Sequence, residues 1–263
     1  KMEGKRLLGA AFLLPLFYLT IMKLAGFCFF LLLLAASVAA QWEFYSMYRI
    51  EGLMKLSGLF FGAVVVAVTY MSKDGFPHIL LFSLMAILSL RLFGKRDPAA
   101  SLRDVAPSVL ALLYIPGLLA FQLFLREKGP EWIIFLFGCV WIADSLALYI
   151  GKGLGRRKLY AEVSPNKTVA GAIGSLMGGG LAGWLLNFLL VHAMTTWKSI
   201  IIGTVIGAVT IIGDLAESMF KRDAGVKDSS TIIPGHGGVL DKIDGVLFAG
   251  PVLYWVSVAA GLI

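Results

Sequence analysis

Residues 198–220 read KSIIIGTVIGAVTIIGDLAESMF, and no charged residue occurs between Lys198 and Asp214. A helix that spans a bilayer needs about 20 mostly apolar residues, so this stretch predicts a transmembrane helix. Its last turns carry Asp214 and Glu217, although an ionisable group at membrane depth costs at least about 2.5–3.5 kcal/mol. The stretch therefore predicts both the class of the fold and a place where charge has a function.

The rest of the chain has the same apolar character. Of its 263 residues, 59% are apolar and 15% are charged, and the mean hydropathy is +0.85. Soluble domains have roughly 45–50% apolar and about 25% charged residues, so we expect an all-α polytopic membrane protein. The two cysteines, Cys28 and Cys139, lie within apolar runs, which excludes a disulfide framework and a cysteine-rich zinc site.

Charged and Pro/Gly-rich clusters divide the chain into about nine predicted transmembrane helices. They lie near residues 7–22, 24–42, 54–72, 77–93, 104–125, 131–151, 169–190, 198–220 and 243–262. Only Lys23 separates the first two, so a single kinked entry segment is the main alternative. We predict two regions: N-terminal helices in residues 1–103, and a catalytic region in residues 104–263 with cytoplasmic loops at 152–168 and 221–242.

The basic residues are distributed unevenly between the two sides that the nine spans create. By this topology, 18 of the 23 lysines and arginines lie on the side of the N-terminus. Basic residues are retained on the cytoplasmic side, so we expect a cytoplasmic N-terminus and a C-terminus on the opposite side. The net charge of +7 is then explained without nucleic acid, which we do not expect as a partner.

Acidic residues interrupt or border three of the predicted spans. They are Asp144, then Asp214 with Glu217, then Asp241 with Asp244. Asp214, Glu217, Ser218 and Lys221 are separated by steps of three and four and share one helix face. Carboxylates that converge in this way suit Mg²⁺, which binds through one or two carboxylates together with substrate phosphates. The alternative is a set of helix caps and interhelical ion pairs.

The two long loops contain groups that bind phosphate. Residues 221–242 combine Lys221, Arg222 and Lys227 with a Ser-Ser-Thr run and the turn Pro-Gly-His-Gly-Gly at 234–238. Backbone amides of such a turn can approach an anion closely. Three roles are open for His236 within this turn: a base, a phosphate contact, or a turn residue without a catalytic part. In the other loop, Lys167 lies in the polar turn Ser164–Thr168 at a helix start, where anions are favoured.

Glycines recur at helical spacing in two neighbouring spans. Span 169–190 contains Gly174, Gly178 and Gly183, and span 198–220 contains Gly203 and Gly207. Rows of small residues let helix backbones approach closely in lipid. The rows indicate tight packing within one chain or between subunits, and they are compatible with a homodimer.

The motifs resemble those of a known family, the CDP-diacylglycerol synthases or phosphatidate cytidylyltransferases. Residues 218–244 read SMFKRDAGVKDSSTIIPGHGGVLDKID, similar to the family pattern Ser-x-x-Lys-Arg, Lys-Asp, Pro-Gly-His-Gly-Gly and Asp-Arg-x-Asp. Asp144-Ser145, the turn at 164–168 and the Gly-Asp-x-x-Glu-Ser stretch at 213–218 also match, in family order. There are two departures from the family pattern. Lys242 stands where the family usually has Arg, and Ala170 stands where an acidic or amide residue commonly follows Lys-Thr-x.

The resemblance implies that CTP and phosphatidate give CDP-diacylglycerol and pyrophosphate at the cytoplasmic face, with Mg²⁺, in the inner membrane of a prokaryote. It leaves open the number of ions and whether a monovalent ion takes part. We expect Asp214, Asp241 and Asp244 to bind metal and, with Lys227, to be catalytic. The expected substrate-binding residues are Asp144, which is also a possible further metal ligand, Ser164, Lys167, Ser218, Lys221, Arg222, His236 and Lys242.

Two other functions remain open at this point. A CTP-dependent polyprenol or phytol kinase would have a similar membrane fold and use of carboxylates, but would release CDP and form a lipid phosphate. A secondary transporter would also bury acidic residues in helices broken by glycine, with sites near the midplane of internal repeats. We find no such repeat, and the charged motifs cluster at one face.

Overall fold

The computed structural model describes residues 18–23, 25–95, 97–232 and 237–263. Its helices are α2 (Gly26–Met47), α3 (Gly52–Met71), α4 (Gly75–Gly94), α5 (Ser101–Leu112), α6 (Phe121–Lys128), α7 (Pro130–Leu154), α8 (Val169–Leu186), α9 (Thr196–Asp223) and α10 (Leu240–Ala259). Two π-helical turns, η1 (Leu113–Gly117) and η2 (Asn187–Val191), continue α5 and α8, and the strands are β1 (Lys158–Tyr160) and β2 (Ser164–Thr168).

The predicted membrane class is confirmed. Within the described residues, eight helical segments are long and apolar enough to span a bilayer, and α5, η1 and α6 together form one of them. These eight agree with the last eight predicted spans to within a few residues at each end. Most of the first predicted span, 7–22, lies outside the described residues; residues 18–23 of the chain are helical.

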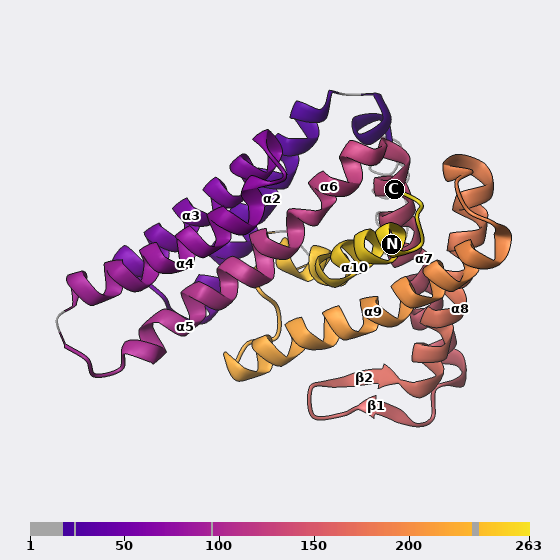
Figure 1. Cartoon of the computed structure of the whole chain (residues 1–263). Helices are drawn as coiled ribbons and strands as arrows, with labels where there is room; N and C mark the ends of the chain where they lie inside the picture. The colour runs from indigo at the N-terminus through magenta and orange to yellow at the C-terminus, as the bar shows by residue number, and fades with distance from the viewer. Residues whose placement is uncertain (1–17, 24, 96, 233–236) are drawn as a thin grey trace.

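One feature of the long loop between α7 and α8 was not expected from the sequence. β1 pairs with β2 as a short antiparallel hairpin, with Lys158 opposite Thr168 and Tyr160 opposite Ser164. Figure 1 shows this hairpin extending beyond the helices at the lower end of the view. The predicted loop at 152–168 is therefore an ordered element rather than an irregular connection.

The helices surround one large apolar core and expose an apolar surface. Buried side chains from α2 to α10, including Phe29, Phe44, Phe135 and Leu253, form this large cluster, and a smaller cluster lies between α3, α4 and α5. On α4, however, Phe82 and Met85 are 59% and 66% exposed. In water such exposure would be unfavourable, whereas in a bilayer these side chains contact acyl chains.

The helices form two groups with α10 between them. Figure 1 shows α2, α3, α4 and α5 side by side on one side, and α7, α8 and α9 on the other. α10 packs against α9, and also contacts α6, α7 and α2. The N-terminal helices thus share a core with the helices that carry the acidic motifs.

The glycine rows pack inside this chain. A Cβ atom at Gly179 would overlap the carbonyl oxygen of Gly203, and one at Gly178 would lie 2.9 Å from the Cα of Ala143 on α7. The Ser175 hydroxyl donates to the Gly207 carbonyl at 3.0 Å. Of the two alternatives that the sequence left open, packing within the chain is the one observed, so these glycines do not argue for a dimer.

A buried arginine orders the connection between α4 and α5. Arg91, 5% exposed, pairs with Asp104 at 2.8 Å. Its guanidinium also donates to the carbonyls of Lys95, Asp97 and Ala99 at 2.8–3.1 Å. Arg91 was counted from the sequence as a topology signal, and in the structure it also holds this loop.

Candidate active site

Three carboxylates converge where α9 and α10 cross. Oxygens of Asp214, Glu217 and Asp244 all lie within 4.8 Å of one another. The helices approach closely because α9 has glycine at 213: a Cβ atom there would lie 2.6 Å from the carbonyl oxygen of Asp244. Three clustered carboxylates repel one another unless a cation or a proton offsets their charge. We call these three residues the acidic cluster.

The surroundings of Glu217 fit a cation. Its side chain is 1% exposed, and its Oε2 atom accepts a hydrogen bond from Lys221 at 2.5 Å. Its Oε1 atom is buried and has no hydrogen-bond partner among the described residues. A buried polar atom without a partner is costly, and carboxylate oxygens are ligands that Mg²⁺ accepts. The acidic cluster therefore has the composition of a divalent-cation site.

Asp241 lies beside the acidic cluster and has other partners. Its Oδ1 atom accepts from Lys221 at 2.6 Å. Its Oδ2 atom accepts from the backbone N–H of Ser229 at 2.9 Å, from the Ser229 hydroxyl at 2.7 Å and from the N–H of Gly238 at 2.8 Å. The sequence predicted Asp241 as a metal ligand with Asp214 and Asp244; the structure groups those two with Glu217 and shows Asp241 engaged by donors.

A cavity of about 760 Å³ adjoins the acidic cluster through Asp214. Its walls come from α7, the hairpin, the start of α8 and α9. The polar residues that line it are Asp144, Lys152, Lys158, Ser164, Asn166, Lys167, Thr168 and Asp214. Asp144, Ser164, Lys167 and Asp214, four of the predicted site residues, are thus brought together around one space.

Lys167 connects the hairpin to the acidic cluster. Its Nζ atom lies 2.7 Å from Oδ2 of Asp214. The next residue, Thr168, begins α8 by accepting a hydrogen bond from the N–H of Gly171 at 3.1 Å. Because the positive end of α8 and Lys167 both border the cavity, this wall of the cavity favours an anion.

Ser218 and Arg222 have local partners near the site. The Ser218 hydroxyl donates to Asp214 Oδ1 at 3.3 Å. Arg222 donates to the carbonyl of Val163 at 3.3 Å and to that of Val226 at 2.9 Å. Arg222 thereby joins the hairpin to the segment that follows α9, and its charge lies at the edge of the site.

The remaining predicted cations are not drawn into the acidic cluster. Lys227 and Lys242 are exposed, and no ion pair involves either of them in the described ranges. His236 lies outside the described residues. Roles for these three residues stay predictions.

Two residues were absent from the predicted site: Glu217, noted only as an acidic residue of the same helix face, and Glu43. Glu43, near the end of α2, is 1% exposed and accepts hydrogen bonds from the N–H groups of Val239 and Leu240, at 2.9 and 2.8 Å. The signal was present, since Glu43 is an acidic residue that directly follows an apolar span. It was overlooked because the motifs lie almost 200 residues further along the chain.

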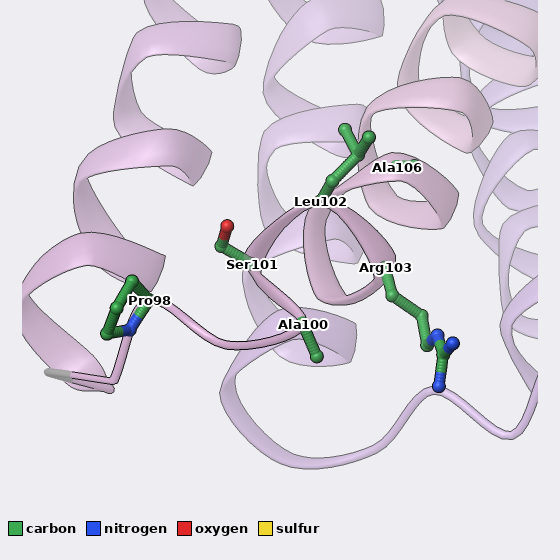
Figure 2. A pocket seen from close by; sticks show the side chains of 6 residues that line it. All are labelled: Pro98, Ala100, Ser101, Leu102, Arg103 and Ala106. Atoms are coloured by element: carbon green, nitrogen blue, oxygen red, sulfur yellow. The ribbon is translucent and has the colours of Figure 1, made fainter.

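A second pocket, of about 550 Å³, lies at the start of α5. Figure 2 shows the six residues that line it: Pro98, Ala100, Ser101, Leu102, Arg103 and Ala106. None of the acidic cluster lines this pocket. We therefore place the candidate site at the cavity beside Asp214.

Comparisons with known proteins point to one family. A model of the cytidylyltransferase family matches residues 4–259. The phosphatidate cytidylyltransferase of Staphylococcus haemolyticus is 30% identical to this chain over 249 residues, which cover 90% of the chain and 93% of the relative.

Two further relatives carry the same name and match over shorter stretches. The protein from Synechocystis is 45% identical over 131 residues, 48% of this chain and 42% of the relative. The protein from Brucella abortus is 42% identical over 161 residues, 61% of this chain and 57% of the relative. These two matches span about half the length of those relatives.

Proposed function

This chain belongs to the cytidylyltransferase family and is a nucleotidyltransferase, and from this premise we propose that it converts CTP and phosphatidate into CDP-diacylglycerol and pyrophosphate. The observation that carries the proposal is the cavity that contains Lys167 and joins the acidic cluster at Asp214. A cationic space next to a cation site suits a nucleoside triphosphate, and the names of the relatives supply phosphatidate as the second substrate.

We propose that Asp214, Asp244 and Glu217 hold Mg²⁺. Asp241 and Asp144 lie at the border of this metal site. When bound, the ion would polarise the α-phosphate of CTP and offset charge on the departing pyrophosphate. Asp241 was expected to be a ligand, and its contacts with Lys221 and Ser229 favour a positioning part instead.

The reaction needs positioning and charge neutralisation more than covalent chemistry. A phosphate oxygen of phosphatidate attacks the α-phosphorus of CTP, the bond between that phosphorus and the bridging oxygen breaks, and pyrophosphate leaves. Because the attacking phosphate is already an anion at neutral pH, no strong general base is needed. Lys167 and Ser164 are placed to contact the triphosphate, while Ser218 orients Asp214.

The other predicted contacts complete the proposal. Lys221 holds Glu217 and Asp241 together and is close enough to the acidic cluster to contact a bound phosphate. We propose that four residues in or beside the α9–α10 loop (residues 224–239) contact substrate phosphates: Arg222, Lys227, Lys242 and His236. Lys227 is the one among them that we predict to affect turnover.

We further propose that the site faces the cytoplasm from the inner membrane of a bacterium. The basic bias of 18 in 23 residues supports this orientation, and the named relatives are bacterial. Membrane lipids then surround the helices and deliver phosphatidate. A homodimer is a further proposal. The glycine rows do not support it, because they pack within the chain.

The test is product analysis with purified protein, CTP, Mg²⁺ and phosphatidate. We expect a lipid that carries CMP, with pyrophosphate released in equal amount. A lipid phosphate with CDP release, formed from a polyprenol or phytol, would identify a kinase and overturn the proposal.

A further inference from the structure

Glu43 is a buried carboxylate that binds the middle of the α9–α10 loop and the junction between this loop and α10. Its Oε1 atom accepts from the Ser230 hydroxyl at 2.7 Å and from the N–H of Val239 at 2.9 Å. Its Oε2 atom accepts from the N–H of Leu240 at 2.8 Å and lies 3.1 Å from the Ser229 hydroxyl. Oε1 thus accepts from one backbone amide and one hydroxyl, and Oε2 accepts from one backbone amide and lies beside a second hydroxyl.

The Ser229 hydroxyl has a single proton, which it can give to one of two carboxylates. Oδ2 of Asp241 is 2.7 Å away and Oε2 of Glu43 is 3.1 Å away, so the shorter distance assigns the proton to Asp241. Glu43 and Asp241 consequently lie on either side of the same hydroxyl, and Asp241 takes its proton. Displacement of Glu43 would therefore shift Asp241 and, through their hydrogen bond, Lys221.

We propose that Glu43 is a positioning residue of the transferase: from α2, it fixes the start of α10 and the α9–α10 loop, and so sets where Asp241 and Asp244 stand. This inference rests on the proposed function. Val239 and Leu240 directly precede Asp241, and both give their N–H groups to Glu43. A carboxylate at a helix start is favourable for electrostatic reasons as well.

The close approach of Glu43 also explains a glycine of the loop motif. A Cβ atom at Gly238 would overlap both Oε2 of Glu43 and the Ser229 hydroxyl. Any other residue at 238 would push Glu43 away from Leu240 or displace Ser229. A position in the motif that reads as a phosphate-binding glycine therefore also makes room for a residue on a distant helix.

Glu43 has no ion-pair partner in the part of the chain that the structure describes. A buried carboxylate without a counter-charge is costly, and here donors from the loop offset that cost. A role limited to helix packing would be served better by an apolar side chain. The arrangement is instead specific for an acceptor of two amides.

Glutamine at position 43 is the sharpest substitution. It keeps the size of the side chain, but one of its two terminal atoms becomes an NH₂ group. Because the N–H groups of Val239 and Leu240 cannot become acceptors, either orientation of the amide sets a donor against a donor. The variant therefore loses the hydrogen bond from one of these two N–H groups while it preserves the packing of the side chain.

The experiment combines hydrogen exchange with steady-state kinetics on the full-length protein in detergent. For Glu43→Gln we expect faster amide exchange in peptides that contain residues 229–232 and 237–242, with α3 and α4 unchanged. We also expect kcat/KM for CTP to fall about 10-fold or more, as for loss of a hydrogen bond to a charged acceptor. A raised KM for CTP and a raised Mg²⁺ requirement, at a melting temperature close to that of the wild type, separate positioning from a structural role.

Glu51→Gln is the matched control, since Glu51 is exposed at the start of α3; we expect wild-type exchange and kinetics from it. If Glu43→Gln does not fold, Ser230→Ala decides, because it removes one donor to Glu43 and should give a weaker change of the same kind. Unchanged exchange in the loop, or kinetics within twofold of wild type, would overturn the inference. Product formation by the wild-type protein, measured in parallel, tests the proposed function separately.

Discussion

Replacing Glu217 with glutamine tests which carboxylates bind the metal. In the structure, Oε2 of Glu217 accepts from Lys221 at 2.5 Å, and Oε1 is buried without a hydrogen-bond partner among the described residues. Glu217 groups with Asp214 and Asp244. Glutamine keeps the contact with Lys221 by turning its oxygen toward that residue. Its NH₂ group then takes the place of the unpartnered Oε1 atom, and an NH₂ group cannot act as a cation ligand.

The expected size of the effect follows from the lost interaction. An interaction with a charged group contributes about 1.5–3 kcal/mol, and each 1.4 kcal/mol corresponds to about tenfold in affinity. Glu217→Gln should therefore raise the Mg²⁺ concentration for half-maximal activity by about 10-fold to 150-fold. The lower end is the safer expectation, because the loss of one negative charge also reduces repulsion between Asp214 and Asp244.

The assay is CDP-diacylglycerol formation during a Mg²⁺ titration in detergent, with Mn²⁺ binding by electron paramagnetic resonance as a second readout. Glu162→Gln is a suitable control, because Glu162 is exposed at the tip of the hairpin. A Glu217→Gln protein whose Mg²⁺ requirement stays within twofold of wild type would refute the assignment. A rise with Asp241→Asn alone would favour the ligand set that the sequence predicted.

Three other substitutions give independent predictions. Lys167→Met should raise the KM for CTP about 10-fold or more in initial-rate assays, because it removes a cation from the cavity wall; an unchanged KM would exclude the contact. Gly179→Ala should lower stability by about 1–3 kcal/mol, since its Cβ overlaps the carbonyl of Gly203, whereas Gly153→Ala, where nothing lies within 4 Å, should leave the melting temperature unchanged. Lys227→Ala should raise the apparent requirement for CTP or for lipid, and a profile equal to wild type would count against its predicted role.

The helices could be predicted because membrane insertion acts on local sequence. A run such as 198–220 must be helical in a bilayer regardless of its neighbours, and helical periodicity alone places Asp214 and Glu217 on one face. The eight described spans accordingly agree with the predicted ones. The polar turn predicted at 164–168 is strand β2 in the structure. Its pairing with residues 158–160 was not predicted either, because such short strands have little periodicity.

The contacts between distant residues could not be predicted in the same way. Glu43 meets Leu240 across 197 positions of sequence, and no local pattern encodes such a distance. The partners of Asp241 were likewise hidden, since Lys221 and Ser229 reach it only after α9 and α10 have packed. The glycine rows predicted close approach correctly, but the identity of the neighbouring helix required the structure.

We propose that this chain joins a cytidylyl group to phosphatidate at a metal bound by carboxylates. The most direct measurement is CTP-dependent formation of CDP-diacylglycerol by purified wild-type and Asp214→Asn proteins that are equally folded. We predict product and pyrophosphate in equal amounts from the wild type, and activity lowered at least about 100-fold in Asp214→Asn, as for removal of a group that acts directly on the transition state. No nucleotide-bearing lipid from the wild type, or near-normal turnover by the variant, would contradict the account.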